Sequence, residues 1–176
     1  MYEVGDLIVY GRTGICEVTE ITTLKMDGVP KDKLYYILRP VHEKHGKVFT
    51  PVDNEKIVMR RVISKEEAEK LIREIPQIEG LWIGNEKQRE EKYRECMKSC
   101  KCAEWVRIIK TLYSRKKSRL AQGKKVTSSD ARYLHLAEDN LYGELSVALG
   151  IPREHVESYL LSQMEGGTQM QPEIQS

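Results

Sequence analysis

The sequence lacks any long apolar run, which excludes an ordinary membrane-spanning helix. Its longest apolar stretches, such as Leu7–Tyr10, are far shorter than the roughly 20 residues that cross a bilayer. The first residues also lack the basic segment that opens a secretory signal peptide. We therefore expect a protein that is made and kept in the cytosol.

Sequence signatures of catalysis are missing as well. There is no P-loop, no glycine-rich dinucleotide fingerprint, no G-x-S-x-G and no H-E-x-x-H. The two glycines of Gly11–Gly14 connect expected strands and do not open a helix, so they do not indicate a phosphate cradle. His135 lies near the apolar stripe of an expected helix, where a structural histidine is favoured over a catalytic base. We expect no enzyme activity, no catalytic residue and no cofactor.

The four cysteines lack the spacing of a zinc site. Cys96, Cys100 and Cys102 form C-x-x-x-C-x-C, whereas structural zinc is usually held by C-x-x-C pairs joined by a second pair or by distant histidines. Cys16 stands alone, and the four histidines are not suitably spaced. We expect reduced structural thiols and no metal site.

The net charge of +2 conceals an asymmetry along the chain. Residues 1–75 carry 13 basic and 13 acidic side chains, whereas residues 86–125 carry 14 basic and 5 acidic ones, a net charge of +9. Residues 126–176 have a net charge of −6. A basic block of this size can neutralise phosphates and release their counterions, which indicates nucleic-acid contact. A solvated helix face would have the same composition, so both interpretations stay open.

The first sixty residues predict short strands separated by turns. Asp27-Gly28 is a hairpin signal, and Pro40 and Pro51 each end an apolar run. Five such strands without an intervening helix predict a small SH3- or Tudor-like β-barrel over residues 1–63. The expected strands are Leu7–Tyr10, Ile15–Leu24, Leu34–Leu38, Lys47–Thr50 and Ile57–Ile63.

After residue 63 the apolar residues recur at the spacing of a helix. Ser64 and Glu67 form a capping box, and Trp105, Ile108 and Leu112 lie on one helical face. We predict an all-α bundle of about five helices over residues 64–165, an α+β chain overall, and a disordered polar tail over residues 166–176. The expected helices span 64–75, 85–99, 102–121, 127–149 and 152–163, and the fourth has an apolar stripe of Leu134, Ala137, Leu141, Leu145 and Ala148.

The two tryptophans have different sequence contexts. Trp105 lies in the apolar stripe of its helix, which predicts a core residue. Trp82 lies in a short linker with Leu81 and Ile83, just before the basic helix. It either packs the barrel against the bundle or is an exposed wedge that stacks on bases or enters a minor groove.

Four segments carry a family resemblance. Val4–Val18 begins with V-G-D, continues as an apolar strand that ends in tyrosine, and then turns at glycine; Lys47–Asn54 is a strand that runs into proline. Cys102–Arg107 contains A-E-W-V-R, and Leu141–Leu145 contains G-E-L. In this order the segments resemble the CarD/CdnL family of bacterial RNA-polymerase-binding regulators, over roughly residues 1–163. The first segment also resembles the polymerase-interacting module of transcription-repair coupling factors.

The resemblance implies that the barrel adds an edge strand to a lobe of the RNA polymerase β subunit. Some relatives have arginines where this chain has Leu24 and Phe49. The implied polymerase-binding residues are Leu24, Lys47, Val48, Phe49 and Thr50.

The resemblance also implies largely sequence-independent contact with promoter DNA and stabilisation of the open promoter complex. Trp82 matches the family's tryptophan that wedges into the minor groove at the upstream edge of melted DNA, and Lys87 matches a nearby DNA-contacting position. We expect a nucleoid-associated protein that is a monomer when free. The expected DNA-binding residues are Trp82, Lys87, Arg89, Arg115, Lys116, Lys117, Lys124, Lys125 and Arg132.

Two other function classes compete with this interpretation. An RNA-binding or ribosome-associated module could use the same basic helices, but single-strand RNA readers usually present several stacking aromatics. Trp82, Tyr93 and Tyr113 are the aromatics near the basic block, and the two tyrosines could belong to the core. An enzyme whose site is assembled from scattered residues is the weakest alternative, because the sequence shows no nucleophile–base pair and no set of metal ligands.

Overall fold

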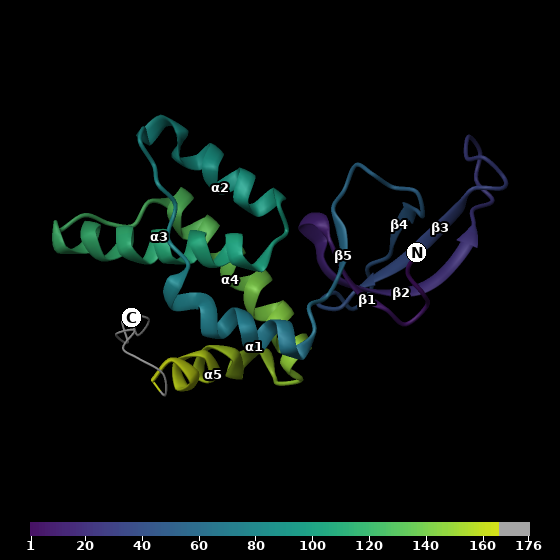
Figure 1. Cartoon of the computed structure of the whole chain (residues 1–176). Coiled ribbons are helices and arrows are strands. Elements are labelled where there is room, and N and C mark those ends of the chain that lie inside the picture. Colours follow the sequence, from purple (N-terminus) through teal and green to yellow (C-terminus); the bar gives the residue numbers. More distant parts are fainter. Residues whose placement is uncertain (166–176) are drawn as a thin grey trace. The chain divides into compact units, whose positions relative to one another are not determined.

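The chain forms two compact units, one of strands and one of helices (Figure 1). In the computed structural model, which describes residues 1–165, the first unit is Met1–Val62 and the second begins at Ile63. The predicted α+β class is confirmed, with a five-stranded antiparallel sheet followed by five α-helices. The predicted disordered tail, residues 166–176, lies outside the described residues.

The first unit is a sheet with the strand order β4-β3-β2-β1-β5, so β4 and β5 are its two edges. The 3-10 turn η1 (Gly11–Thr13) joins β1 to β2, and Gly28, at φ 82°, lies in the expected turn between β2 and β3. The amide of Asn54 donates to the Met59 sulfur at 3.3 Å, which links the segment after β4 to β5. The strands are β1 (Leu7–Tyr10), β2 (Gly14–Thr23), β3 (Leu34–Pro40), β4 (Val48–Pro51) and β5 (Met59–Arg61).

One face of this sheet is buried because apolar residues alternate along the strands. In β3, Tyr36 and Leu38 are buried in the core, whereas Ile37 between them is half-buried on the other face. In β4, Thr50 is buried and Phe49 is 50% exposed. The edge strand therefore presents an apolar side chain on its outer face, opposite Ile37 in the register.

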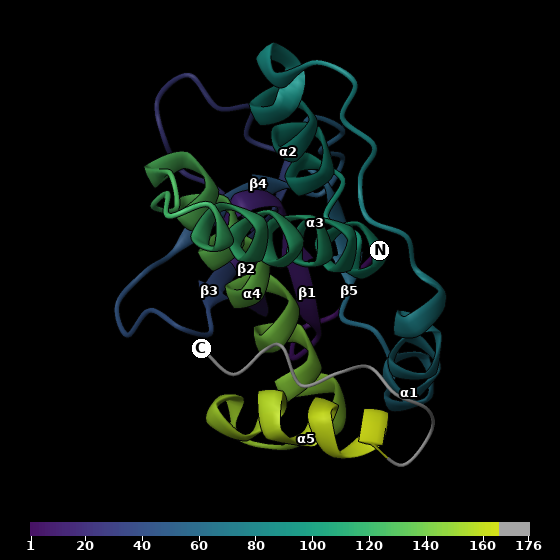
Figure 2. The same cartoon turned by 90° about the vertical axis from the view of Figure 1, so that its left-hand side faces the viewer.

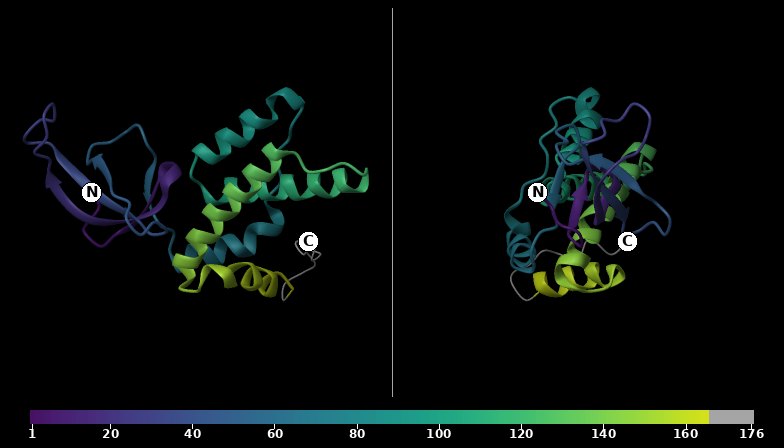
Figure 3. Two further views of the ribbon diagram at one scale, coloured as in Figure 1. Left: turned by 180° about the vertical axis from the view of Figure 1, so that it is seen from behind. Right: turned by 90° about the vertical axis from the view of Figure 1, so that its right-hand side faces the viewer.

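The second unit is a helical bundle in which α4 packs against α3, α5 and α1. Figures 2 and 3 show it from further sides, with α2 on one side of α3 and the α1–α5 pair on the other. The bounds are α1 (Lys65–Glu74), η2 (Ile75–Gln77), η3 (Glu86–Gln88), α2 (Arg89–Lys98), α3 (Cys102–Ala121), α4 (Ser128–Leu149) and α5 (Arg153–Glu165). Across residues 1–165, no helix combines the length and apolarity that a membrane span requires.

Local signals set the helix ends. The capping box of Ser64 and Glu67 is present, and the Thr127 hydroxyl accepts from the Asp130 N–H at 3.1 Å. Gly150 ends α4 in the left-handed conformation at φ 68°. The predicted stripe of α4 is buried at Ala137, Leu141 and Leu145 and half-buried at its ends, Leu134 and Ala148. Asp130, Tyr133 and Glu144 are also buried on this helix.

Candidate functional site

Trp82 is 79% exposed and lies in the coil between η2 and η3. Trp105, by contrast, is 2% exposed within α3, which confirms its prediction as a core residue. An indole that is this exposed is not part of the core of the helical unit. Its ring is therefore available to a partner molecule, with an apolar face and an N–H donor.

The backbone leading to Trp82 is fixed along α3 and α2 by three side chains. The Lys110 ammonium donates to the carbonyls of Ile75 and, at 2.7 Å, Ile78. The Leu81 N–H donates to the Thr111 hydroxyl at 2.8 Å, and the Lys92 ammonium donates to the Trp82 carbonyl at 2.7 Å. We call Lys92, Lys110 and Thr111 the clamp.

The indole ring is itself held in place. The Lys92 ammonium lies 5.0 Å from its centroid, within range of a cation–π interaction. On Gly84, an added Cβ would lie 2.4 Å from Cη2 of the Trp82 ring, so the indole rests where only glycine leaves room. The exposed ring thus has a cation over its face and Gly84 beside its edge.

An open groove of about 430 Å³ lies next to the segment that carries Trp82, although Trp82 itself does not line it. Leu81 and Ile83, the neighbours of Trp82 in sequence, line one side of it. Guanidinium and hydroxyl groups around the groove are the donors that phosphate oxygens accept from. The other lining residues are Arg89, Thr111, Ser114, Arg115, Ser118, Arg119 and Gln122.

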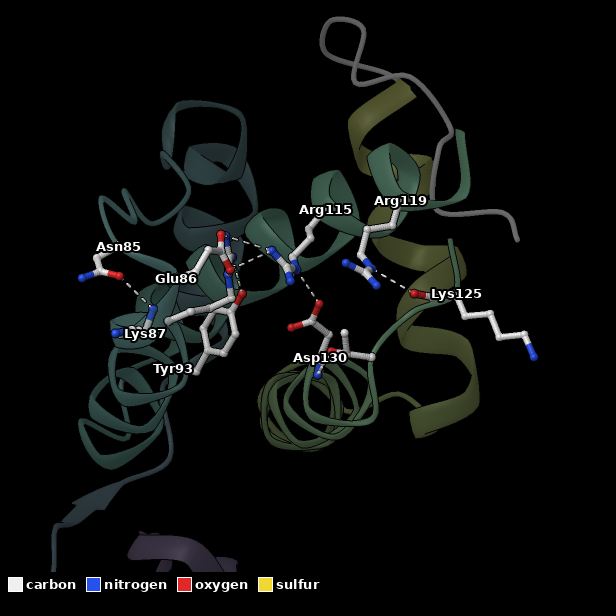
Figure 4. Close-up of polar contacts among 10 residues, drawn as sticks. Asn85, Glu86, Lys87, Tyr93, Arg115, Arg119, Lys125 and Asp130 are labelled. Atoms are coloured by element: carbon white, nitrogen blue, oxygen red, sulfur yellow. Dashed lines mark hydrogen bonds and ion pairs between the residues drawn. The ribbon is translucent and has the colours of Figure 1, made fainter. Parts of the chain in front are cut away.

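Two of the predicted DNA-binding arginines meet at this groove around one carboxylate. Glu86 accepts from Arg89 at 2.9 Å and 2.7 Å, and from Arg115 at 3.3 Å and 3.4 Å. On its other side, Arg115 donates to Asp130 at 2.6 Å, and Figure 4 shows its guanidinium between the two carboxylates. The hydrogen bonds from Arg89 hold the pKa of Glu86 at about 2, so this carboxylate is ionised at neutral pH.

The other predicted DNA-binding residues are distributed over several surfaces. Lys87 is exposed in η3, and Lys124 and Lys125 are exposed in the loop between α3 and α4, where Arg119 donates to the Lys125 carbonyl (Figure 4). Arg132 is ion-paired with Glu90 at 2.8 Å. Helical geometry places Lys116 and Lys117 on the two flanks of the groove-lining face of α3, away from Arg115.

Sequence reasoning missed the clamp and Arg119. Lys92, Lys110 and Arg119 belong to the basic block, but their partners are backbone carbonyls that no residue pattern reveals. One signal was available for Arg119. It lies four residues after Arg115 and eight after Thr111, and therefore on the same helical face.

The predicted polymerase-binding residues lie at and near the β4 edge. Lys47 and Phe49 are exposed and Val48 is half-buried, but Thr50 as a whole residue is only 1% exposed, so the prediction that it contacts a partner is not supported. Leu24 is half-buried just beyond β2, and β3 lies between β2 and β4.

Comparison with known protein families assigns each of the two units to a known domain. The CarD-like/TRCF RID domain matches residues 2–63, and the C-terminal domain of CarD matches residues 83–161. A search of curated proteins found no match. Both domains occur in their family order over most of the chain, and the strands and helices described above agree with them. The chain thus belongs to the CarD family of RNA-polymerase-interacting transcription regulators.

Proposed function

We propose that this regulator docks through the β4 edge on the β subunit of RNA polymerase, and contacts promoter DNA through Trp82 and the adjacent basic surface. In this proposal residues 1–63 carry the docking contact and residues 64–165 the DNA contact, in a protein that is a monomer when free. The result is stabilisation of the open promoter complex. The observation that carries the proposal is the exposed, clamped indole of Trp82 beside the guanidinium-lined groove.

The mechanism is differential binding. An indole can insert between base steps that are kinked or partly unstacked, whereas a regular duplex must first be deformed at a cost of a few kcal/mol. A wedge therefore favours the open promoter over the closed one, and shifts their equilibrium by the difference in its affinity for the two. The clamp supports this role because a pre-positioned ring loses little entropy on insertion.

The docking part of the proposal follows from the position of β4 at an edge of the sheet. β4 pairs with β3 on one side only, so a partner strand can add to its other side. Phe49 projects from the outer face at this edge, with Ile37 opposite it in the register, and offers an apolar contact next to the strand-to-strand hydrogen bonds.

An RNA-reading function is less well supported. Tyr93 is fully buried, and the Tyr113 hydroxyl donates to Glu138 at 2.8 Å on a half-buried side chain. Of the three aromatics near the basic block, only Trp82 is exposed. A reader of single strands would need several such platforms.

The test is Trp82→Ala in a promoter-opening assay with purified polymerase. We expect an unchanged melting temperature and polymerase affinity but a shorter open-complex lifetime, because the exposed ring adds nothing to the core. Trp105→Ala is the matched control: removal of its buried ring costs about 3–5 kcal/mol and should reduce all activities together. A large loss of stability in Trp82→Ala, with a proportionate loss of every activity, would refute the wedge.

A further inference from the structure

We propose that the Glu86 carboxylate occupies the position of a DNA phosphate between Arg89 and Arg115, and that it competes with DNA there. This inference rests on the proposed DNA-binding function and deepens it. It adds an acidic residue that sets how strongly the basic surface binds DNA. Binding then requires that a phosphate displaces the carboxylate.

The contacts of Glu86 match those of a bound phosphate group. Nε and Nη2 of Arg89 donate to its two oxygens at 2.9 Å and 2.7 Å, which is the parallel two-bond geometry that arginine also forms with phosphate. Arg115 donates to the same two oxygens from a second direction. Two guanidiniums converging on one pair of oxygens form a site for a single anionic group.

Both arginines keep a second anchor when Glu86 leaves. Arg89 donates to the buried Tyr93 hydroxyl at 2.7 Å, and its guanidinium lies 5.9 Å from the centroid of that ring. Arg115 donates to Asp130, whose side chain is only 7% exposed. These buried partners fix where the guanidiniums point. The Glu86 side chain is 67% exposed, so it can swing into solvent without disturbing the packing.

The location connects this exchange to the wedge. Arg89 and Arg115 line the groove whose other side is formed by Leu81 and Ile83, the neighbours of Trp82. A phosphate that replaces Glu86 would therefore belong to DNA held along the segment that carries the indole. Internal competition lowers affinity for the bulk duplex away from polymerase, and leaves the tethered protein able to bind.

A positioning role for Glu86 predicts the opposite result. If its carboxylate were needed to orient Arg89 and Arg115, its removal would weaken DNA binding. If it competes, removal leaves two oriented guanidiniums available and strengthens binding. The sign of the change therefore separates the two roles.

The experiment compares the full-length wild type with Glu86→Gln and with Glu91→Gln. Glu91 is exposed in the first turn of α2, so this control makes the same charge change in a neighbouring position. Binding of a fluorescent duplex with an unpaired fork is titrated from about 50 to about 200 mM salt. Thermal melts verify that each variant folds.

We expect Glu86→Gln to bind roughly fivefold to tenfold more tightly near 100 mM salt, because the phosphate no longer has to displace a carboxylate from the two guanidiniums. Glu91→Gln should change affinity by less than about twofold, because a more distant surface charge is screened. Equal effects of the two variants, or weaker binding by Glu86→Gln, would overturn the competition while leaving DNA binding intact. Absence of binding by wild type and both variants at the lowest salt would overturn the proposed function, and the inference with it.

Discussion

Glu144 is a fully buried carboxylate on α4. It accepts from the Ile63 N–H at 3.0 Å, and from the Cys102 thiol at 3.1 Å. It therefore ties the residue at which the helical unit begins to the first turn of α3. A buried acidic group that receives hydrogen bonds from separate elements orders their junction, because an unpaired charge there would be costly.

We predict that Glu144→Ala lowers the free energy of unfolding of the helical unit by about 2–4 kcal/mol, since it leaves two buried donors without this acceptor. Glu144→Gln retains one carbonyl oxygen and should cost about 1 kcal/mol. Denaturant unfolding followed by tryptophan fluorescence measures this directly, because both tryptophans lie in that unit. Glu154→Ala, at an exposed position on α5, is the control. A Glu144→Ala variant as stable as this control would contradict the role.

Sequence patterns predicted the burial of Trp105 but not that of Glu144. Trp105 was assigned to the core correctly because it repeats with Ile108 and Leu112 at helical spacing, and its environment follows from that period. Glu144 was not predicted to be buried, since acidic residues are buried only when a partner exists. Its partners are 81 and 42 residues away in the chain, and no local pattern identifies them.

At the scale of elements, segment 75–82 acts as a support for Trp82. It has a 3-10 turn at η2 and no further regular structure, so the clamp replaces the hydrogen bonds that a helix or sheet would supply. Thr111 holds its far end, and the same hydroxyl donates to the Arg107 carbonyl at 2.7 Å within α3. Loss of this hydroxyl should release the segment more than it weakens the helix.

Thr111→Val should therefore cost only about 1 kcal/mol of stability while it shortens the open-complex lifetime. Valine retains the shape of threonine but cannot accept from the Leu81 N–H, so the indole becomes less ordered and inserts at a greater entropic cost. Thr111→Ser restores the hydroxyl and should restore the lifetime. An unchanged lifetime in Thr111→Val would show that the Thr111 hydroxyl is not needed to position Trp82.

Elements were easier to predict than the contacts between them. The bounds of α3 follow the sequence prediction, and the caps at Ser64 and Thr127 are local signals that the structure bears out. The predicted fifth strand is shorter, Met59–Arg61, because only these residues pair with β1. The ion pairs that gather η3, α3 and α4 around Arg115 join charges 29 and 15 residues apart. Composition revealed the basic block but not which of its members are already paired.

At the scale of the whole molecule, our proposal gives polymerase docking to one unit and DNA contact to the other. Contact with phosphates is salt-dependent and largely independent of sequence, and Glu86 weakens it further. Docking on polymerase converts this weak contact into an intramolecular one at a high effective concentration. Affinity for polymerase should then set the protein concentration at which the open-complex lifetime begins to increase. The wedge should set the maximum lifetime that is reached.

This division predicts different concentration responses for two variants. Phe49→Asp places a charge on the outer face of β4, so it should weaken polymerase binding and shift the open-complex response to higher protein concentration without lowering its plateau. Trp82→Ala should lower the plateau without shifting the midpoint, because docking is intact. Val58→Asp is the control, as an exposed residue just before the opposite edge strand β5. Open-complex lifetimes measured over a range of protein concentrations distinguish midpoint from plateau. If Phe49→Asp lowers the plateau at every protein concentration, the β4 edge does more than tether the protein. If its midpoint equals that of Val58→Asp, the docking surface lies elsewhere.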